Sequence, residues 1–99
     1  MSLGFSGLAF EGLAFEGELT VMTAAEQHAR LRAYLRGTGP FELDLSGVTE
    51  LDTAGLQLLL AAHHDARQQG TRLTLRHPSP AVATALSVAH LDTGSLGAL

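Results

Sequence analysis

From Phe41 to Gly70 the chain has the sequence FELDLSGVTELDTAGLQLLLAAHHDARQQG, which predicts a buried strand, a short acidic connection and a long helix. Apolar and acidic residues alternate from Phe41 to Leu45, and this is the period of a strand with one buried face. Ser46-Gly47 is expected to end the strand, because both residues favour turns. A strand followed at once by a helix is the basic unit of an α/β fold.

The helix is expected to run from about Thr53 to Gln69, with Asp52 or Thr53 accepting hydrogen bonds from the free N–H groups of its first turn. Those N–H groups and the helix dipole both favour negative charge. A phosphate on Thr53 would therefore meet hydrogen-bond donors. The apolar stripe of this helix consists of Leu56, Leu59, Ala62, His63 and Ala66.

The segments on either side repeat this alternation of strand and helix. Apolar residues at every second position from Leu13 to Val21 predict a strand. Thr23-Ala24-Ala25-Glu26 has the spacing of a capping box and predicts a helix to about Arg36. Arg72 to Arg76 alternates as a short strand, and Ser79-Pro80 has the residue types that begin a third helix.

The ends of the chain carry weaker signals. The sequence of Gly7 to Glu11 is repeated as Gly12 to Glu16, which predicts two edge strands or one strand after a turn. Leu91 to Gly94 is expected to be a turn or loop, and residues 1–6 are expected to be disordered or derived from an expression vector. We therefore expect residues 1–99 to form a single α/β domain, with parallel pairing in its second half.

The composition indicates a globular domain and argues against several classes of function. The 99 residues are 45% hydrophobic and 16% charged, which is typical of a globular domain. The formal net charge of −4 and the six arginines without any lysine argue against nucleic-acid binding. No apolar run approaches the roughly 20 residues of a membrane span, and no signal peptide is recognised, so we expect a cytoplasmic protein without membrane insertion.

Catalytic and metal-binding patterns are missing from the sequence. There is no cysteine, and without lysine neither a P-loop nor Schiff-base chemistry is available. His63 and His64 point about 100° apart on a helix and are not expected to share a metal. Asp44 and Asp52 are best explained as loop and cap carboxylates, the alternative being that they bracket a metal in a partner complex or orient Thr53. We expect no enzyme activity and no cofactor.

Several motifs together resemble one family. LDLSGVT at residues 43–49, followed by LDTAGL at residues 51–56, resembles the STAS domain of bacterial anti-sigma factor antagonists. GELTV at 17–21 with TAAE at 23–26, and LTL at 73–75 with PSPAV at 78–82, extend the resemblance over about residues 15–90. The resemblance implies a STAS-like, four- to five-stranded mixed sheet covered by three or more helices.

The resemblance also implies a function. In that family the residue after the helix-opening aspartate is the phosphorylated Ser or Thr, here Thr53, although many members have a further Ser or Thr at the position of Ala54. It implies a regulatory protein-interaction module, an antagonist-like switch controlled by phosphorylation at Thr53. The residues expected to bind a partner are Asp52, Thr53, Ala54, Gly55, Leu56, Gln57 and Leu60.

The implied partners are an anti-sigma factor, which is a serine/threonine kinase of the histidine-kinase-like type, and a phosphatase. Two alternatives stay open. STAS adaptor subunits of a phospholipid ABC transporter, which are not phosphorylated, resemble this chain and imply docking to an ABC ATPase. STAS proteins linked to chemotaxis are similar as well.

Overall fold

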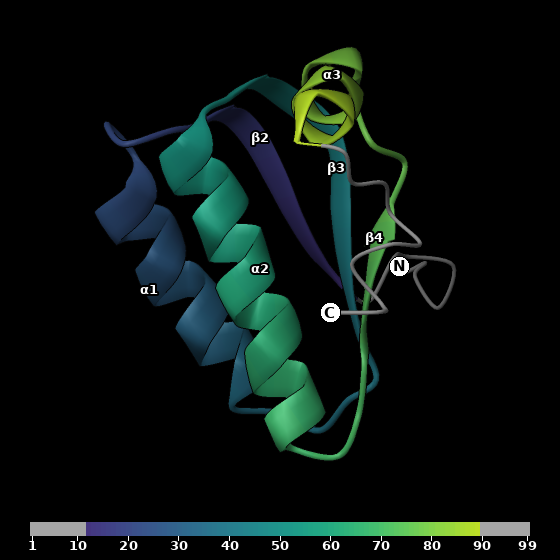
Figure 1. Cartoon of the computed structure of the whole chain (residues 1–99). Helices are drawn as coiled ribbons and strands as arrows, with labels where there is room; N and C mark the ends of the chain where they lie inside the picture. Colours follow the sequence, from purple (N-terminus) through teal and green to yellow (C-terminus); the bar gives the residue numbers. More distant parts are fainter. Residues whose placement is uncertain (1–11, 90–99) are drawn as a thin grey trace, which may run out of the picture.

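A parallel sheet with helices packed against it forms the domain (Figure 1). The computed structural model describes residues 12–89. Helices α1 and α2 lie side by side on one face of the sheet, and α3 packs against β3. In chain order the elements are β2 (Leu13–Leu19), α1 (Ala24–Leu35), β3 (Phe41–Leu51), α2 (Thr53–Gln68), β4 (Leu73–Arg76) and α3 (Pro80–Val88).

The sheet differs from the expected one in size and type. The predicted α/β fold, a sheet covered by three helices, is confirmed. Residues 12–89 contribute three strands in the order β2-β3-β4 and both neighbouring pairs are parallel, which is fewer strands than the four or five predicted and not the predicted mixed sheet. Each pair is parallel because a helix carries the chain back to the starting edge of the sheet between strands. The repeat copy at Gly7 to Glu11, the turn at Leu91 to Gly94 and residues 1–6 lie outside the described residues.

Strand β3 is longer than the sequence predicts. The predicted end of the strand at Ser46-Gly47 is wrong, since β3 continues through these residues to Leu51. The register with β2 shifts twice, between Ala14 and Glu16 and again between Gly17 and Glu18, so that β3 carries the extra residues as bulges. At a bulge, two residues of one strand lie opposite a single residue of its partner, and the pairing of the two strands continues beyond it.

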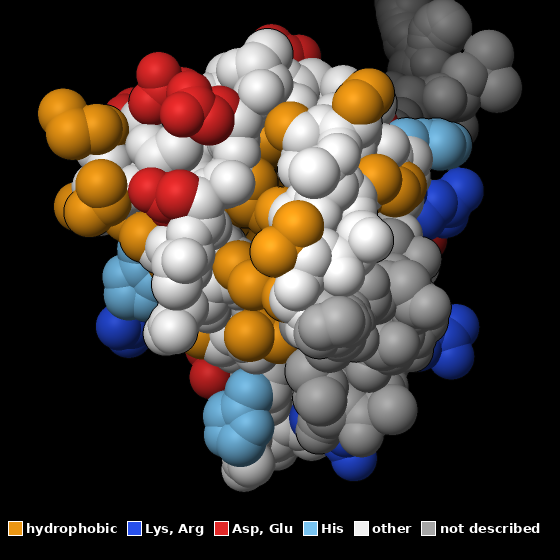
Figure 2. Space-filling view, turned by 45° about the horizontal axis from the view of Figure 1, so that its top comes forward, with side chains coloured by type: hydrophobic (Ala, Val, Ile, Leu, Met, Phe, Trp, Pro, Cys, Tyr) orange, Lys and Arg blue, Asp and Glu red, His pale blue; other side chains and the backbone are white. Residues whose placement is uncertain are grey.

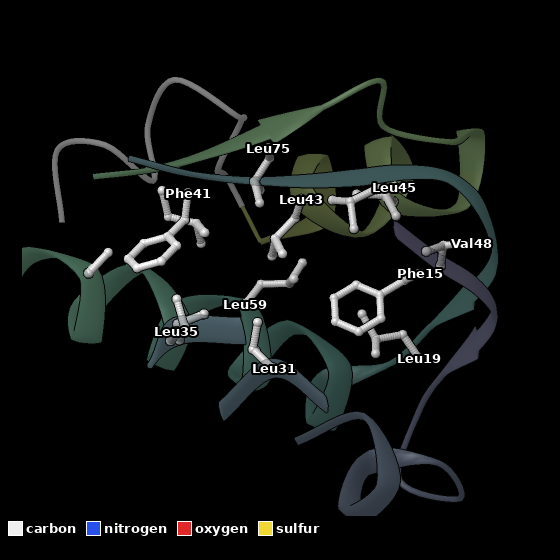
Figure 3. Packing of buried hydrophobic residues seen from close by; sticks show 14 of the residues in the cluster. Phe15, Leu19, Leu31, Leu35, Phe41, Leu43, Leu45, Val48, Leu59 and Leu75 are labelled. Atoms are coloured by element: carbon white, nitrogen blue, oxygen red, sulfur yellow. The ribbon is translucent and has the colours of Figure 1, made fainter. Parts of the chain in front are cut away.

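The core lies between the sheet and the two helices (Figure 3). Leu31 and Leu35 of α1 and Leu59 of α2 point toward the inner face of β3. The first half of β3 buries every second residue, as predicted, and the α2 stripe is buried from Leu59 to Ala66. The largest fully buried side chains are Phe41, Leu19, Leu43, Leu45, Leu59 and Val82.

One titratable side chain lies inside this packing. His63 is 4% exposed, and neither of its ring nitrogens has a hydrogen-bond partner. Burial lowers the pKa of His63 below its usual value of 6.5, and the charges of Arg67 and His64 lower it further. The imidazole is therefore harder to protonate in the native state than in the unfolded chain.

The neutral His63 makes stability depend on pH. As the pH falls from about 7.5 to about 5.5, through the usual pKa of histidine, the unfolded chain binds a proton more readily than the native state, so the free energy of unfolding should fall. Replacing His63 by leucine should reduce this dependence and raise stability at pH 7 by about 1 kcal/mol. Urea titrations over that pH range measure both effects. His64→Gln, on the exposed neighbour, is the control, and an unchanged pH dependence in His63→Leu would contradict the prediction.

Candidate functional site

Asp52 joins the carboxyl ends of two strands. It is the N-cap of α2, and its Oδ1 accepts a hydrogen bond from the N–H of Gly55 at 3.0 Å. Its Oδ2 accepts another from the N–H of Val21 at 3.0 Å, and its own N–H donates to the carbonyl of Leu19 at 3.4 Å. Because parallel strands end at the same edge of a sheet, one carboxylate can hold both the turn after β2 and the start of α2.

These two backbone donors also fix the ionisation of the carboxylate. The N–H of Val21 and then that of Gly55 hold the pKa of Asp52 below its ordinary value of 3.8. A carboxyl group whose pKa is lowered on folding stabilises the native state above its unfolded pKa and loses that contribution as the pH falls. Asp52 is thus a charged cap throughout the neutral range.

The turn after β2 presents two apolar side chains. Within it the N–H of Thr20 donates to Thr23 Oγ1 at 3.1 Å, and the N–H of Met22 donates to Thr20 Oγ1 at 3.2 Å. Thr23 therefore makes no side-chain cap for α1, and the expected capping box is wrong, because its hydroxyl is engaged by the turn. The expected place of Val21 on a strand face is wrong too: β2 ends at Leu19, and Val21 is exposed.

Thr53 lies on the rim of a shallow hollow beside this turn. The hollow has a volume of about 270 Å³ and is lined by Leu51, Asp52, Thr53, Leu56, Ala85, Val88 and Ala89. As predicted, α2 begins at Thr53, and the side chain of Thr53 is exposed. Its hydroxyl has no hydrogen-bond partner among residues 12–89, so it is open to another molecule.

The chain matches a model of a known protein family. The family model described as "Mlab, STAS domain" matches residues 9–98. The chain belongs to the STAS family. A search of curated proteins finds no match to it. STAS domains generally act as interaction modules, so the surface around Thr53 is a candidate contact surface.

The residues predicted to bind a partner are only partly accessible in this STAS domain. Thr53 and Gln57 are exposed, whereas Asp52, Ala54, Leu56 and Leu60 are half-buried. Gly55 is buried against the end of β2, so it can affect a contact only by setting the position of α2. Thr53 and Leu56 line the same hollow, and Gln57 and Leu60 do not belong to its lining.

Other residues of the surface were not predicted. Val21 and Met22 come from the turn after β2, and Ala85 and Val88 come from α3. The exposed fractions are 69% for Val21, 84% for Met22 and 74% for Val88. The sequence contained a signal in Val21-Met22, two large apolar residues directly before the start of a helix.

The other candidate ligands of the STAS domain are not assembled into a site. Residues 12–89 hold no group of three His, Asp or Glu side chains that could bind a metal. Asp44 accepts a hydrogen bond from the N–H of Ser46, which is the main reason its pKa is lowered, and lies 3.9 Å from His77. Asp52 lies eight positions after Asp44, just beyond the end of β3, which is about 20 Å or more at strand spacing, so the two do not bracket one metal. None of the helices in this part of the chain is long and apolar enough to cross a membrane.

Proposed function

We propose that this STAS domain is a regulatory docking module of the anti-sigma factor antagonist type, controlled by phosphorylation of Thr53. The observation that carries the proposal is the position of Thr53, exposed on the first turn of α2 and on the rim of an apolar hollow. A partner that covers the hollow must contact this side chain. A kinase that modifies it would therefore change the contact surface directly.

Phosphorylation at this place should change the surface and leave the fold intact. The phosphate would add a charge of about −1.5 to −2 at pH 7. The amino end of α2 attracts an anion by about 0.3–1 kcal/mol, but the Asp52 carboxylate already accepts the N–H of Gly55 there and repels a second anion. The two effects oppose each other, and the buried core is not involved. A phosphate at the rim would instead place charge where a partner's apolar side chain would sit.

The partners that we propose are an anti-sigma factor with a histidine-kinase-like serine/threonine kinase fold, and a phosphatase that reverses the modification. STAS domains are generally interaction modules without catalytic activity, which supports binding as the mode of action here. We propose that this exchange takes place in the cytoplasm.

Thr53→Glu tests the proposal. The variant should weaken binding to the cognate kinase by about tenfold or more, because its carboxylate would be buried against the apolar hollow. Its melting temperature should stay within about 4 °C of the original. Calorimetric titration and thermal melts measure the two quantities, and mass spectrometry after incubation with kinase and ATP should place a phosphate on Thr53.

Thr84→Glu is the matched control, since Thr84 is an exposed threonine of α3 that does not line the hollow. It should leave the affinity unchanged. Unchanged kinase binding by Thr53→Glu, or a large loss of stability in that variant, would refute the proposal.

A second candidate function is docking without phosphorylation, as a STAS adaptor subunit of a phospholipid ABC transporter. The family description, which names Mlab, favours it. Ala54 also lacks the second hydroxyl that many phosphorylated members carry. Co-purification with an ABC ATPase, with no phosphate found at Thr53 after incubation with candidate kinases, would support this candidate over the first. The same measurements would reveal a chemotaxis-linked partner.

A further inference from the structure

We propose that the hollow beside Thr53 receives a basic amphipathic segment of the partner, which places an apolar side chain in the hollow and an arginine or lysine on Glu18 and Glu50. This inference rests on the proposed docking function and adds the chemistry of the occupant. We use the term docking face for the hollow together with the Val21-Met22 turn.

The docking face gathers the exposed large apolar side chains of residues 12–89. These are Val21, Met22 and Val88. Val88 lines the hollow, and the Val21-Met22 turn adjoins it through Asp52, which lines the hollow and accepts the N–H of Val21. Exposed apolar side chains that cluster in one place usually mark an interaction surface. The turn that carries Val21 and Met22 is held by its own hydrogen bonds and by Asp52, so the backbone at these two residues is held in place.

The size of the hollow fits a protein side chain better than a small molecule. Its volume of about 270 Å³ lies below the about 300–1,000 Å³ of typical small-molecule pockets. Leu51, Leu56 and Val88 contribute apolar side chains, and Asp52 is the charged member of its lining. One or two apolar side chains of a partner would fill it.

The charge of the docking face indicates which residues of the partner should flank the apolar side chain that fills the hollow. Glu18 of β2 and Glu50 of β3 are exposed register partners, and Glu50 directly precedes Leu51, which lines the hollow. The Glu18 carboxylate accepts one hydrogen bond, from Thr20 Oγ1 at 3.2 Å, so it keeps acceptor capacity for a cation. Like charges directly opposite on a sheet destabilise it, and a cation supplied from outside would relieve the repulsion. An arginine could contact both carboxylates through its guanidinium fork.

Three arginines of residues 12–89 lie away from the hollow. Arg32 and Arg36 line a separate groove with Leu35 and Gln69, and Arg76 pairs with Glu42 at 3.0 Å. No arginine lines the hollow. Figure 2 shows acidic and apolar side chains gathered over the upper part of the face in view, with arginine at its margins. An acidic partner segment would be repelled here.

Two synthetic peptides of equal length and leucine content test the inference, one with arginine and one with glutamate at every polar position. Each is titrated into the ¹⁵N-labelled full chain. The arginine peptide should shift the amide signals of Met22, Leu56 and Val88, and the glutamate peptide should not. Raising the salt concentration should weaken the binding, because these charges are exposed.

Charge variants make the test specific. Glu18→Gln with Glu50→Gln should weaken binding of the arginine peptide about fivefold, as expected for two exposed ion pairs. Glu42→Gln, which removes a carboxylate already paired with Arg76, is the matched control and should change the affinity less than about twofold. Equal binding of both peptides, shifts away from the docking face, or a dimer of this chain that covers Val88 would overturn the inference.

The same titration separates this inference from the function on which it rests. In one outcome, the arginine peptide binds as expected, and Thr53→Glu binds both the peptide and the kinase with unchanged affinity. This outcome would support a basic partner segment and would refute control by phosphorylation of Thr53. In the other outcome, the two peptides bind equally, and Thr53→Glu no longer binds the kinase. This outcome would refute the proposed positive charge of the partner segment and would support control by phosphorylation of Thr53.

Discussion

Gly55→Ala is expected to destabilise the domain by about 3 kcal/mol, although alanine is the better helix former. A Cβ atom at residue 55 would overlap the carbonyl oxygen of Leu19 and come within 2.6 Å of Leu51 Cδ1. The carbonyl belongs to the backbone at the end of β2, so it cannot move away as a flexible side chain could. Urea denaturation of the two proteins measures the difference.

The sign of this effect is the informative result. Helix propensity alone predicts that alanine stabilises the first turn of α2 by about 1 kcal/mol relative to glycine. Gly37→Ala is the matched control, because a Cβ there meets the Tyr34 carbonyl oxygen at 3.4 Å, an ordinary contact. A stabilised Gly55→Ala variant would show that α2 is not held against β2 as described.

The close approach at Gly55 also sets the geometry of the docking face. It brings the start of α2 to the end of β2, where Asp52 can accept the N–H groups of both Gly55 and Val21. A wider separation would move Thr53 away from the Val21-Met22 turn. Gly55 of the LDTAGL motif therefore affects the docking face by setting the position of α2, and not by touching a partner.

Much of the fold could be predicted from local signals in the sequence. The start of α2 at Thr53 and the start of α3 at Pro80 were correct, because cap residues act on the turn that follows them: Ser79 accepts the N–H of Val82 at 3.2 Å. The continuation of β3 through Ser46-Gly47 was not predictable, because the bulges are defined by the register with β2, and register is a tertiary property.

The site was predictable only where it is contiguous in sequence. Thr53 and Leu56 were named because they follow Asp52 in one helix. Alternation alone extends the predicted strand to Val21, because it does not show where a strand ends. The hydrogen bond from the N–H of Val21 to Asp52, which shows that Val21 belongs to the site, spans 31 positions. Val88 was missed because only the packing of α3 on β3 brings it to the hollow.

Leu59→Ala should be the most damaging truncation on α2, with a loss of about 3–5 kcal/mol. Leu59 is 0% exposed and points between α1 and the inner face of β3 (Figure 3). Removing its side chain leaves a cavity that close-packed neighbours fill only in part. Chemical denaturation measures the loss, and Leu58→Ala, on a half-buried neighbour, should cost only about 1 kcal/mol.

Variants at Leu59 and Thr53 should also separate stability from binding, because Leu59 is buried in the core whereas Thr53 is exposed on the first turn of the same helix. Leu59→Ala lowers stability but leaves the docking face in place, so the folded fraction should bind the kinase with unchanged affinity. Thr53→Glu should do the reverse, with binding lost and stability kept. If both variants lost stability and binding together, the surface at Thr53 would belong to the same cooperative packing as the core, and a modification there could not act as a switch without unfolding the domain.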